Sequence, residues 1–266
     1  MVVSKILRWA PVPVAAALMA GVAAVAASLP FEFVHFGNFT RMVESGHSGG
    51  QVLLADLPQR KGDWGLGATA SLKGEIVQID GRLLVSPGSD AQGRVQAPQR
   101  GEEAVLFVGA RVAAWAEVTV PSDMNQAQLE SFVRGHAAAR GLSLEQPFVF
   151  RVEGRFPHLM WHVVTGEPSA IGQGLQGQPG GHGGHRGHGA MMAGGHANQQ
   201  SGMKVFHAPG ATGALVGVYS GAGLEGVVSH AGERFHLHYV DSDATVSGHV
   251  DRYAVAAGAV LKLPVP

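Results

Sequence analysis

Apolar and polar residues alternate near the end of the chain in the pattern of a β-strand. In Phe235-His236-Leu237-His238-Tyr239-Val240, apolar or aromatic residues separate two histidines. Successive side chains of an extended segment point to opposite faces, so His236 and His238 share one face. Residues 241–246 supply a turn-forming connection, and a returning strand places His249 opposite His238. The pattern predicts a hairpin on which three imidazole rings converge.

A second hairpin is predicted upstream, where residues 74–79 and 82–85 flank an Asp80-Gly81 turn. On its first strand Glu75 shares a face with the apolar Val77 and Ile79. Partial burial would raise the pKa of this carboxyl group and let it hold a proton near neutral pH. The other interpretation, which the hairpin alone favours, is that Glu75 is the solvated end of the strand.

Weaker patterns predict the remaining elements. Leu129, Phe132 and Val133 recur at helical spacing within residues 125–140, where Ser122 and Asp123 are candidate N-caps. A short helix is expected at residues 39–44, and strands at 104–108, 112–120 and 213–219. Strands at 147–152 and 159–164 are expected to pair around Glu153-Gly154-Arg155.

Composition favours a β-rich fold with a sizeable core. The chain has 266 residues, of which 45% are hydrophobic and only 15% charged, with 39 glycines and 14 prolines. This balance is typical of many turns and short strands. The formal net charge is −1 and no basic stripe is present, so nothing suggests nucleic acid as a partner. The absence of cysteine excludes disulfides and thiolate metal ligands.

The first 28 residues have the pattern of a secretory signal peptide. Lys5 and Arg8 precede an apolar run over residues 12–27 that ends in small residues. The run is shorter than the ~20 residues that a membrane-spanning helix needs. We therefore expect a periplasmic or secreted domain over residues 29–266, free of the membrane after cleavage. An uncleaved N-terminal anchor is the alternative.

The composition of residues 172–203, which are rich in histidine, glycine and methionine, predicts a mobile insertion. The core of this segment is Gly180-Gly181-His182-Gly183-Gly184-His185, which cannot bury enough surface to offset its ordering entropy. Its histidines and methionines are ligands for soft or borderline metal ions. A plain disordered insertion is an equal alternative.

The histidine hairpin indicates a metal site. Imidazole suits zinc, copper, iron and nickel, and three protein ligands with an open fourth position are typical of a catalytic zinc. The alternative is that His236 and His238 lie on a solvent-facing strand edge, because 14 histidines make such coincidences easy.

Three separated blocks resemble the acetolactate decarboxylase family. They are residues 65–81, with Gly74-Glu75 and Asp80-Gly81, then residues 213–217, and finally the histidine strand with Gly248-His249-Val250. The blocks fall in the family's order with the histidine spacing intact. The resemblance covers about residues 34–255, is thin over 86–146 and is absent in the histidine-rich insertion.

The resemblance implies a two-part α+β fold with a mixed sheet and an antiparallel sheet, and a zinc site between them. It implies that His236, His238 and His249 hold the zinc, which binds the hydroxyl and keto oxygens of 2-acetolactate, a 2-hydroxy-3-keto acid. Decarboxylation to acetoin leaves negative charge on the former carbonyl oxygen, and a Lewis acid stabilises it. Glu75 matches the family's glutamate and carries over as the acid that handles the proton.

Two departures from the family separate the functional interpretations. His162 stands where the family has an arginine, and imidazole does not replace a guanidinium reliably. Arg151 or Arg155 could compensate, and no match for the family's late glutamate follows Val255. An exported zinc-dependent acetolactate decarboxylase is the first hypothesis, and a catalytically impaired, extracytoplasmic metal-binding relative is the second.

A cupin-like metal oxygenase is a third interpretation, because a His-x-His strand also occurs in cupins. It requires an acidic ligand a few residues later, and Asp241 is only a partial match. A homodimer is the default expectation for the assembly.

Overall fold

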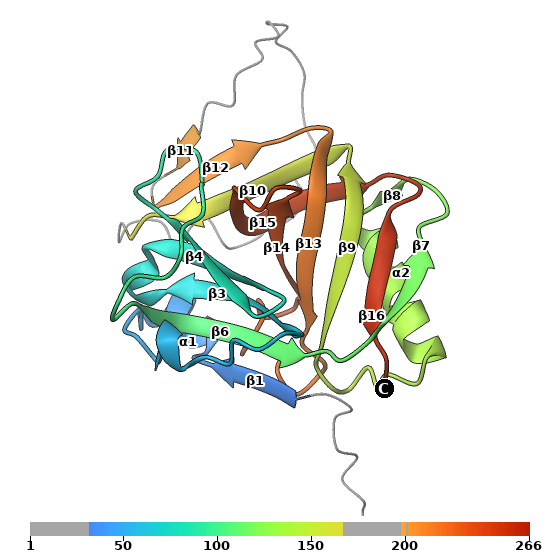
Figure 1. Ribbon diagram of the computed structural model, residues 1–266, viewed down its shortest axis with the longest axis horizontal. Helices are drawn as coiled ribbons and strands as arrows, with labels where there is room; N and C mark the ends of the chain where they lie inside the picture. Colours follow the sequence, from blue (N-terminus) through green and yellow to red (C-terminus); the bar gives the residue numbers. More distant parts are fainter. Residues whose placement is uncertain (1–31, 167–197, 201) are drawn as a thin grey trace, which may run out of the picture.

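Two β-sheets pack against each other in the computed structural model, which describes residues 32–166, 198–200 and 202–266 (Figure 1). The six-stranded sheet, called the small sheet here, has the order β1-β6-β3-β4-β5, with β2 paired to β6. Its strands are β1 (Glu32–Phe36), β2 (Val52–Leu53), β3 (Asp63–Thr69), β4 (Gly74–Ile79), β5 (Arg82–Pro87) and β6 (Glu103–Arg111).

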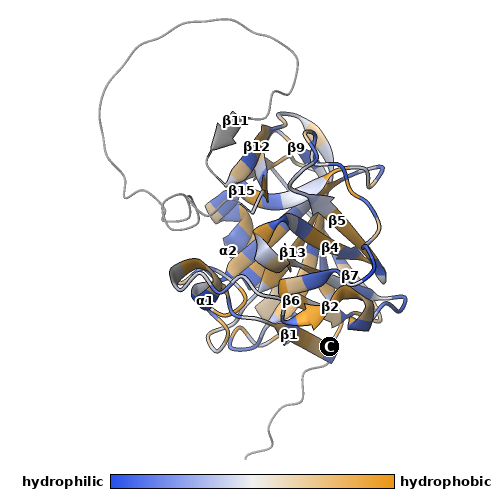
Figure 2. Ribbon diagram, turned by 90° about the vertical axis from the view of Figure 1, so that its left-hand side faces the viewer, coloured by the Kyte–Doolittle hydropathy of each residue, from blue (hydrophilic) through white to orange (hydrophobic). Residues whose placement is uncertain are grey.

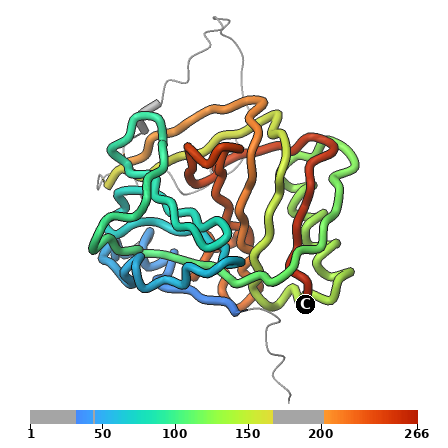
Figure 3. Tube along the Cα trace, viewed as in Figure 1, coloured from blue at the N-terminus to red at the C-terminus, as the bar shows by residue number. Residues whose placement is uncertain are grey.

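The ten-stranded sheet, called the large sheet, has the order β11-β12-β10-β15-β14-β13-β9-β16-β7, with β8 paired to β15. Its strands are β7 (Trp115–Thr119), β8 (Met124–Asn125), β9 (Phe148–Phe156), β10 (His158–Val164), β11 (Asn198–Gln200), β12 (Met203–His207), β13 (Ala211–Tyr219), β14 (Phe235–Asp241), β15 (Ser247–Val255) and β16 (Val260–Pro264). The trace in Figure 3 shows that the first part of the chain builds the small sheet and the later part the large one.

The β-rich α+β class is confirmed, but the expected mixed sheet is wrong. Every strand pairing among the described residues is antiparallel. Parallel neighbours need a long crossover, usually through a helix. The described helices are too few for that: α1 (Phe39–Glu44), α2 (Gln126–Ala139) and the 3-10 turns η1 (Leu54–Asp56) and η2 (Ala70–Leu72).

Local signals gave the β4–β5 hairpin and the long helix correctly. Asp80 and Gly81 have φ angles of 49° and 87°, the left-handed conformation that an Asp-Gly hairpin turn requires. The N-cap of α2 is Asn125, which forms a capping box with Gln128. The expected caps Ser122 and Asp123 are wrong, since Asp123 instead accepts a hydrogen bond from the backbone N–H of Ala257.

The expected pairing of the strands around Glu153-Gly154-Arg155 is also wrong. These residues lie inside β9, which continues to Phe156 and pairs with β13 and β16, whereas β10 pairs with β12 and β15. A Cβ at Gly154 would lie 2.6 Å from the Ala259 side chain. Gly154 therefore permits a close approach of neighbouring backbone and does not make a turn.

Apolar side chains fill the space between the two sheets. Figure 2 shows hydrophobic residues along the strands and hydrophilic ones along the loops at the edges. One buried cluster joins the sheets; it contains Trp64, Leu66, Val77, Leu84 and Val108 from the small sheet, and Val149, Val216 and Val218 from the large one. The hydroxyl of Ser86 on β5 also donates a 2.7 Å hydrogen bond to the carbonyl of Ser247 on β15. These contacts set the two hairpins predicted from the sequence against each other.

The predicted signal peptide, residues 1–28, lies outside the described residues, and so does most of the predicted insertion at 172–203. Among the helices that the structure describes, none has the length and hydrophobicity to cross a membrane.

Candidate metal centre

Three histidines of the large sheet meet on the side that faces the small sheet. His236 and His238 come from β14 and His249 from β15, and His238 pairs with His249 in the register that the sequence predicts. Each offers one ring nitrogen, and these three atoms lie within 4.8 Å of one another. His236 and His238 are only 3% and 0% exposed, so the interpretation as a solvent-facing strand edge is wrong.

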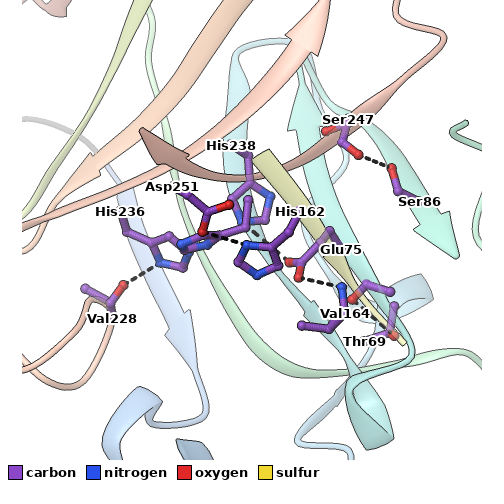
Figure 4. Close-up of polar contacts among 12 residues, drawn as sticks. Thr69, Glu75, Ser86, His162, Val164, Val228, His236, His238, Ser247 and Asp251 are labelled. Carbon is purple, nitrogen blue, oxygen red and sulfur yellow. Dashed lines mark hydrogen bonds and ion pairs between the residues drawn. The ribbon is translucent and has the colours of Figure 1, made fainter. Parts of the chain in front are cut away.

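Hydrogen bonds fix the orientation of the first ring. His236 donates from Nδ1 to the backbone carbonyl of Val228 at 2.8 Å (Figure 4). Its Nε2 is then directed to Nδ1 of His249, 3.1 Å away. A ligating histidine in metalloproteins commonly donates its second ring N–H to a carbonyl in this way.

Burial keeps these rings neutral. It lowers the pKa of His236 to about 3, helped by the charges of His230 and His162, and lowers the pKa of His238 and His249 well below the usual value. The neutral imidazole is the form that binds a metal ion.

Glu75 faces this cluster from the small sheet. Its side chain is 4% exposed, so the interpretation as a solvated strand end is wrong. One carboxyl oxygen, Oε2, lies 3.6 Å from Nε2 of His238, and Oε1 accepts a 3.4 Å hydrogen bond from the N–H of Val164. Burial raises the pKa of Glu75 to about 8, although the charge of His162 and the Val164 hydrogen bond oppose the shift. The carboxyl group therefore holds a proton at neutral pH.

His162 lies on β10, opposite His249 of β15. Its ring is 3% exposed, with its centroid 4.8 Å from that of His249, and its Nδ1 lies 2.8 Å from Oδ1 of Asp251. Burial alone would lower the pKa of His162, but the charge and hydrogen bond of Asp251 and the charge of Glu75 raise it above its usual value. The His162 ring is therefore protonated more readily than the rings of His236, His238 and His249.

Sequence reasoning missed two further residues beside the cluster. Asp251 follows His249 by two positions, which in a strand is a signal for a shared face. His230 sits in the loop before β14, where its ring centroid is 4.2 Å from that of Phe39 and 6.0 Å from that of His249. Burial lowers the pKa of His230 to about 4, and nothing in its local sequence marks it.

The arginines considered as substitutes for the family's arginine lie elsewhere. The guanidinium of Arg151 stacks 3.8 Å from the Trp64 ring centroid and pairs with Glu153, and Arg155 is exposed. The carboxylate of Asp241 accepts hydrogen bonds from Thr245 and Val246 in the β14–β15 turn. Asp241 is therefore a turn residue, which removes the acidic ligand that the cupin-like interpretation requires.

A largely apolar cavity adjoins these groups, with about 460 Å³ of empty space that opens to solvent. The lining residues come from both sides: Phe39, Met42, Ala68, Leu72, Glu75 and Leu106 from the small-sheet side, and His162, Val164, Met203, His236 and His249 from the large sheet. His236, His249 and Glu75 thus line one cavity between the sheets.

The histidine cluster fits a transition metal ion by its chemistry. Three neutral ring nitrogens form a borderline-soft donor set of the kind that zinc binds. Nε2 of His238 is buried and has no hydrogen-bond partner within the described part of the chain. Such an orphaned nitrogen is costly unless it has a ligand.

Comparisons with known proteins point to one family. Residues 35–173 match the family described as alpha-acetolactate decarboxylase. An alpha-acetolactate decarboxylase of Streptococcus thermophilus is 23% identical over 223 residues, which are 83% of this chain and 80% of the relative. The family match ends before the histidine hairpin, but the alignment with this relative extends over most of the chain.

Solved structures of low identity share the fold. An acetolactate decarboxylase from Bacillus subtilis subspecies spizizenii matches with a TM-score of 0.66 at 16% identity, over 88% of this chain and 86% of its own. That of Bacillus subtilis strain 168 matches with a TM-score of 0.64 at 18% identity, over 88% and 85%. A Staphylococcus aureus protein of unknown function, described as similar to alpha-acetolactate decarboxylase, gives 0.63 at 14% identity, over 86% and 84%.

Proposed function

Because the chain belongs to the alpha-acetolactate decarboxylase family, we propose that it is a metal-dependent decarboxylase that converts 2-acetolactate into acetoin and carbon dioxide. The observation that carries this proposal is the placement of the buried Glu75 carboxyl group 3.6 Å from Nε2 of His238, beside a cavity that Glu75 shares with His236 and His249. The family match also removes the cupin-like interpretation.

The metal we propose is zinc, held by His236, His238 and His249. When bound, it supplies a Lewis acid that offsets the negative charge left on the substrate oxygens by the loss of carbon dioxide. The hydrogen bond from His236 to the Val228 carbonyl orients one of these ligands before the ion arrives.

Glu75 delivers the proton. When the bond to the carboxylate carbon breaks, carbon dioxide leaves and the electron pair remains on the substrate. The carbon that lost the carboxylate must then gain one proton to give acetoin. A buried carboxyl group with a pKa of about 8 is protonated before the reaction and sits at the cavity wall.

His162 contacts the substrate carboxylate in place of the family's arginine. It lines the cavity beside His249, and its raised pKa favours a ring that donates hydrogen bonds. The apolar side chains around it, among them Met203 and Val164, exclude water and strengthen such a contact. A single imidazole gives one point of contact where a guanidinium gives two.

The test measures bound metal and acetoin release for the purified zinc-loaded protein and its Glu75→Gln variant. We expect one zinc per chain in both, and a loss of kcat of about 10²–10⁴-fold in the variant, because it lacks the proton donor. Glu145→Gln, at an exposed position, is the matched control and should behave as the parent does. Stoichiometric metal without turnover in the parent would instead support the metal-binding relative.

We also propose that the protein acts outside the cytoplasm, in the periplasm or after secretion. The support is the basic and then apolar pattern of residues 1–28. Mass spectrometry of the protein recovered from each cell fraction measures this directly. A periplasmic or secreted product that begins near residue 29 is the expected result, and a full-length cytoplasmic product would contradict it.

A further inference from the structure

We infer that Asp251 is the positioning residue for His162. Its carboxylate binds Nδ1 of the His162 ring, which leaves the other ring nitrogen, Nε2, available to a ligand in the cavity. The partner assigned to Nε2, the substrate carboxylate, rests on the proposed function. The hydrogen bond between the two side chains does not.

The contact itself defines which nitrogen is bound. Oδ1 of Asp251 lies 2.8 Å from Nδ1 of His162 (Figure 4). A carboxylate can only accept hydrogen bonds, so Nδ1 must carry the proton. A ring that is free to rotate about χ2 can present either nitrogen to the cavity, whereas the bonded ring presents Nε2 alone.

A β-bulge lies at Asp251. On β15, Val250 pairs with Trp161 and Arg252 pairs with Met160, so Asp251 is an extra residue without a partner on β10. Bulges commonly redirect a side chain beside an active site. Beyond the bulge Tyr253 faces the same core cluster as Val250, although the two residues are an odd number of positions apart.

The second oxygen of Asp251 argues against a purely structural role. Oδ2 is buried and makes no hydrogen bond with any residue that the structure describes. Burying a carboxylate with one oxygen unsatisfied costs free energy. If this position served only the stability of the strand, an apolar residue there would avoid the cost.

The kinetic test uses Asp251→Asn, which keeps the size of the side chain but can turn an amide N–H toward Nδ1 and so favour the other tautomer. With 2-acetolactate as substrate and zinc bound, we expect KM to rise by roughly tenfold or more, with metal content unchanged. Asp243→Asn, on the exposed turn of the same hairpin, is the matched control and should leave KM unchanged.

A double-mutant cycle shows whether Asp251 acts through His162. In a His162→Gln background, Asp251→Asn should change KM by less than twofold, because there is no imidazole left to orient. The same tenfold effect in both backgrounds would overturn the inference.

A spectroscopic measurement separates this inference from the proposed function, because it needs no turnover. Long-range ¹H–¹⁵N spectra of the histidine-labelled, zinc-loaded protein report which ring nitrogen carries a proton, and the His162→Gln spectrum assigns the signal. We expect Nδ1 of His162 to be protonated in the parent and to lose that proton in Asp251→Asn. A protonated Nδ1 in a protein that does not turn over acetolactate would keep the inference and reject the proposed function. An unprotonated Nδ1 in an active enzyme would overturn the inference alone.

Discussion

The two walls of the cavity carry different chemistry. The small-sheet wall offers one titratable side chain, Glu75, surrounded by apolar residues such as Leu72 and Leu106. The large-sheet wall carries the three histidines of the candidate metal site together with His162 and Asp251. The three histidines of the candidate metal site thus sit on one hairpin of the large sheet, while Glu75 sits on the small sheet. Under the proposed function, metal binding depends on the large-sheet wall alone, whereas turnover needs both walls.

Removing a ligand from the large-sheet wall should have the largest effect. His238→Ala takes away the ring that is fully buried between His249 and Glu75, so we expect zinc affinity to fall by more than ~100-fold and acetoin release to fall to background. Metal analysis after dialysis and a turnover assay measure both. His207→Ala, at an exposed histidine of β12, is the control. If His238→Ala bound zinc normally, the ligand assignment would be wrong.

The large-sheet wall should also make the metal-free protein sensitive to acid. The pKa of His236 is about 3 in the folded protein and near 6.5 when unfolded, so between these values the unfolded chain binds more protons. The contribution of His236 to stability is therefore fully present above pH 6.5 and is lost as the pH falls toward 3. Between pH 6.5 and pH 5, His236 alone accounts for about 2 kcal/mol. Urea unfolding of the parent and of His236→Leu, which should show a shallower loss, is the measurement; equal slopes would contradict it.

The small-sheet wall should give a dependence of the opposite sign. The pKa of Glu75 is raised from 4.5 to about 8, so the folded protein binds the extra proton and the contribution of Glu75 to stability is greatest at low pH. The contribution of Glu75 falls as the pH rises from about 4.5 to about 8 and is constant beyond. Between pH 6.5 and pH 8, where His236 no longer titrates, we expect a loss of about 2 kcal/mol in the metal-free parent. Glu75→Gln should reduce this loss, and the part that persists is expected from His162, whose raised pKa acts in the same direction; an undiminished loss would contradict the role assigned to Glu75.

Local sequence signals were sufficient for the parts of the site that lie on one hairpin. The alternation around His236 and His238 and the turn before His249 fixed the register, and the Asp80-Gly81 turn fixed the strand that carries Glu75. Only the family resemblance implied that these two hairpins face each other, because that arrangement depends on packing between the sheets.

Features that depend on contacts between distant parts of the chain could not be predicted from the sequence. Gly154 suggested a turn, but it lies in a strand because Ala259 approaches it. The bulge at Asp251 depends on the pairing of β15 with β10, and no alternation pattern predicts which residue is left without a partner. His230 approaches His249 from a loop whose position is set by Phe39 and the neighbouring backbone.

We propose that His236, His238 and His249 hold one metal ion that Glu75 faces across the cavity. Anomalous diffraction at the zinc edge from crystals of the zinc-loaded protein locates such an ion. We expect one strong peak between the three ring nitrogens, with the Glu75 carboxyl group on its open side. A strong peak elsewhere in the chain, with none among these three histidines, would contradict it.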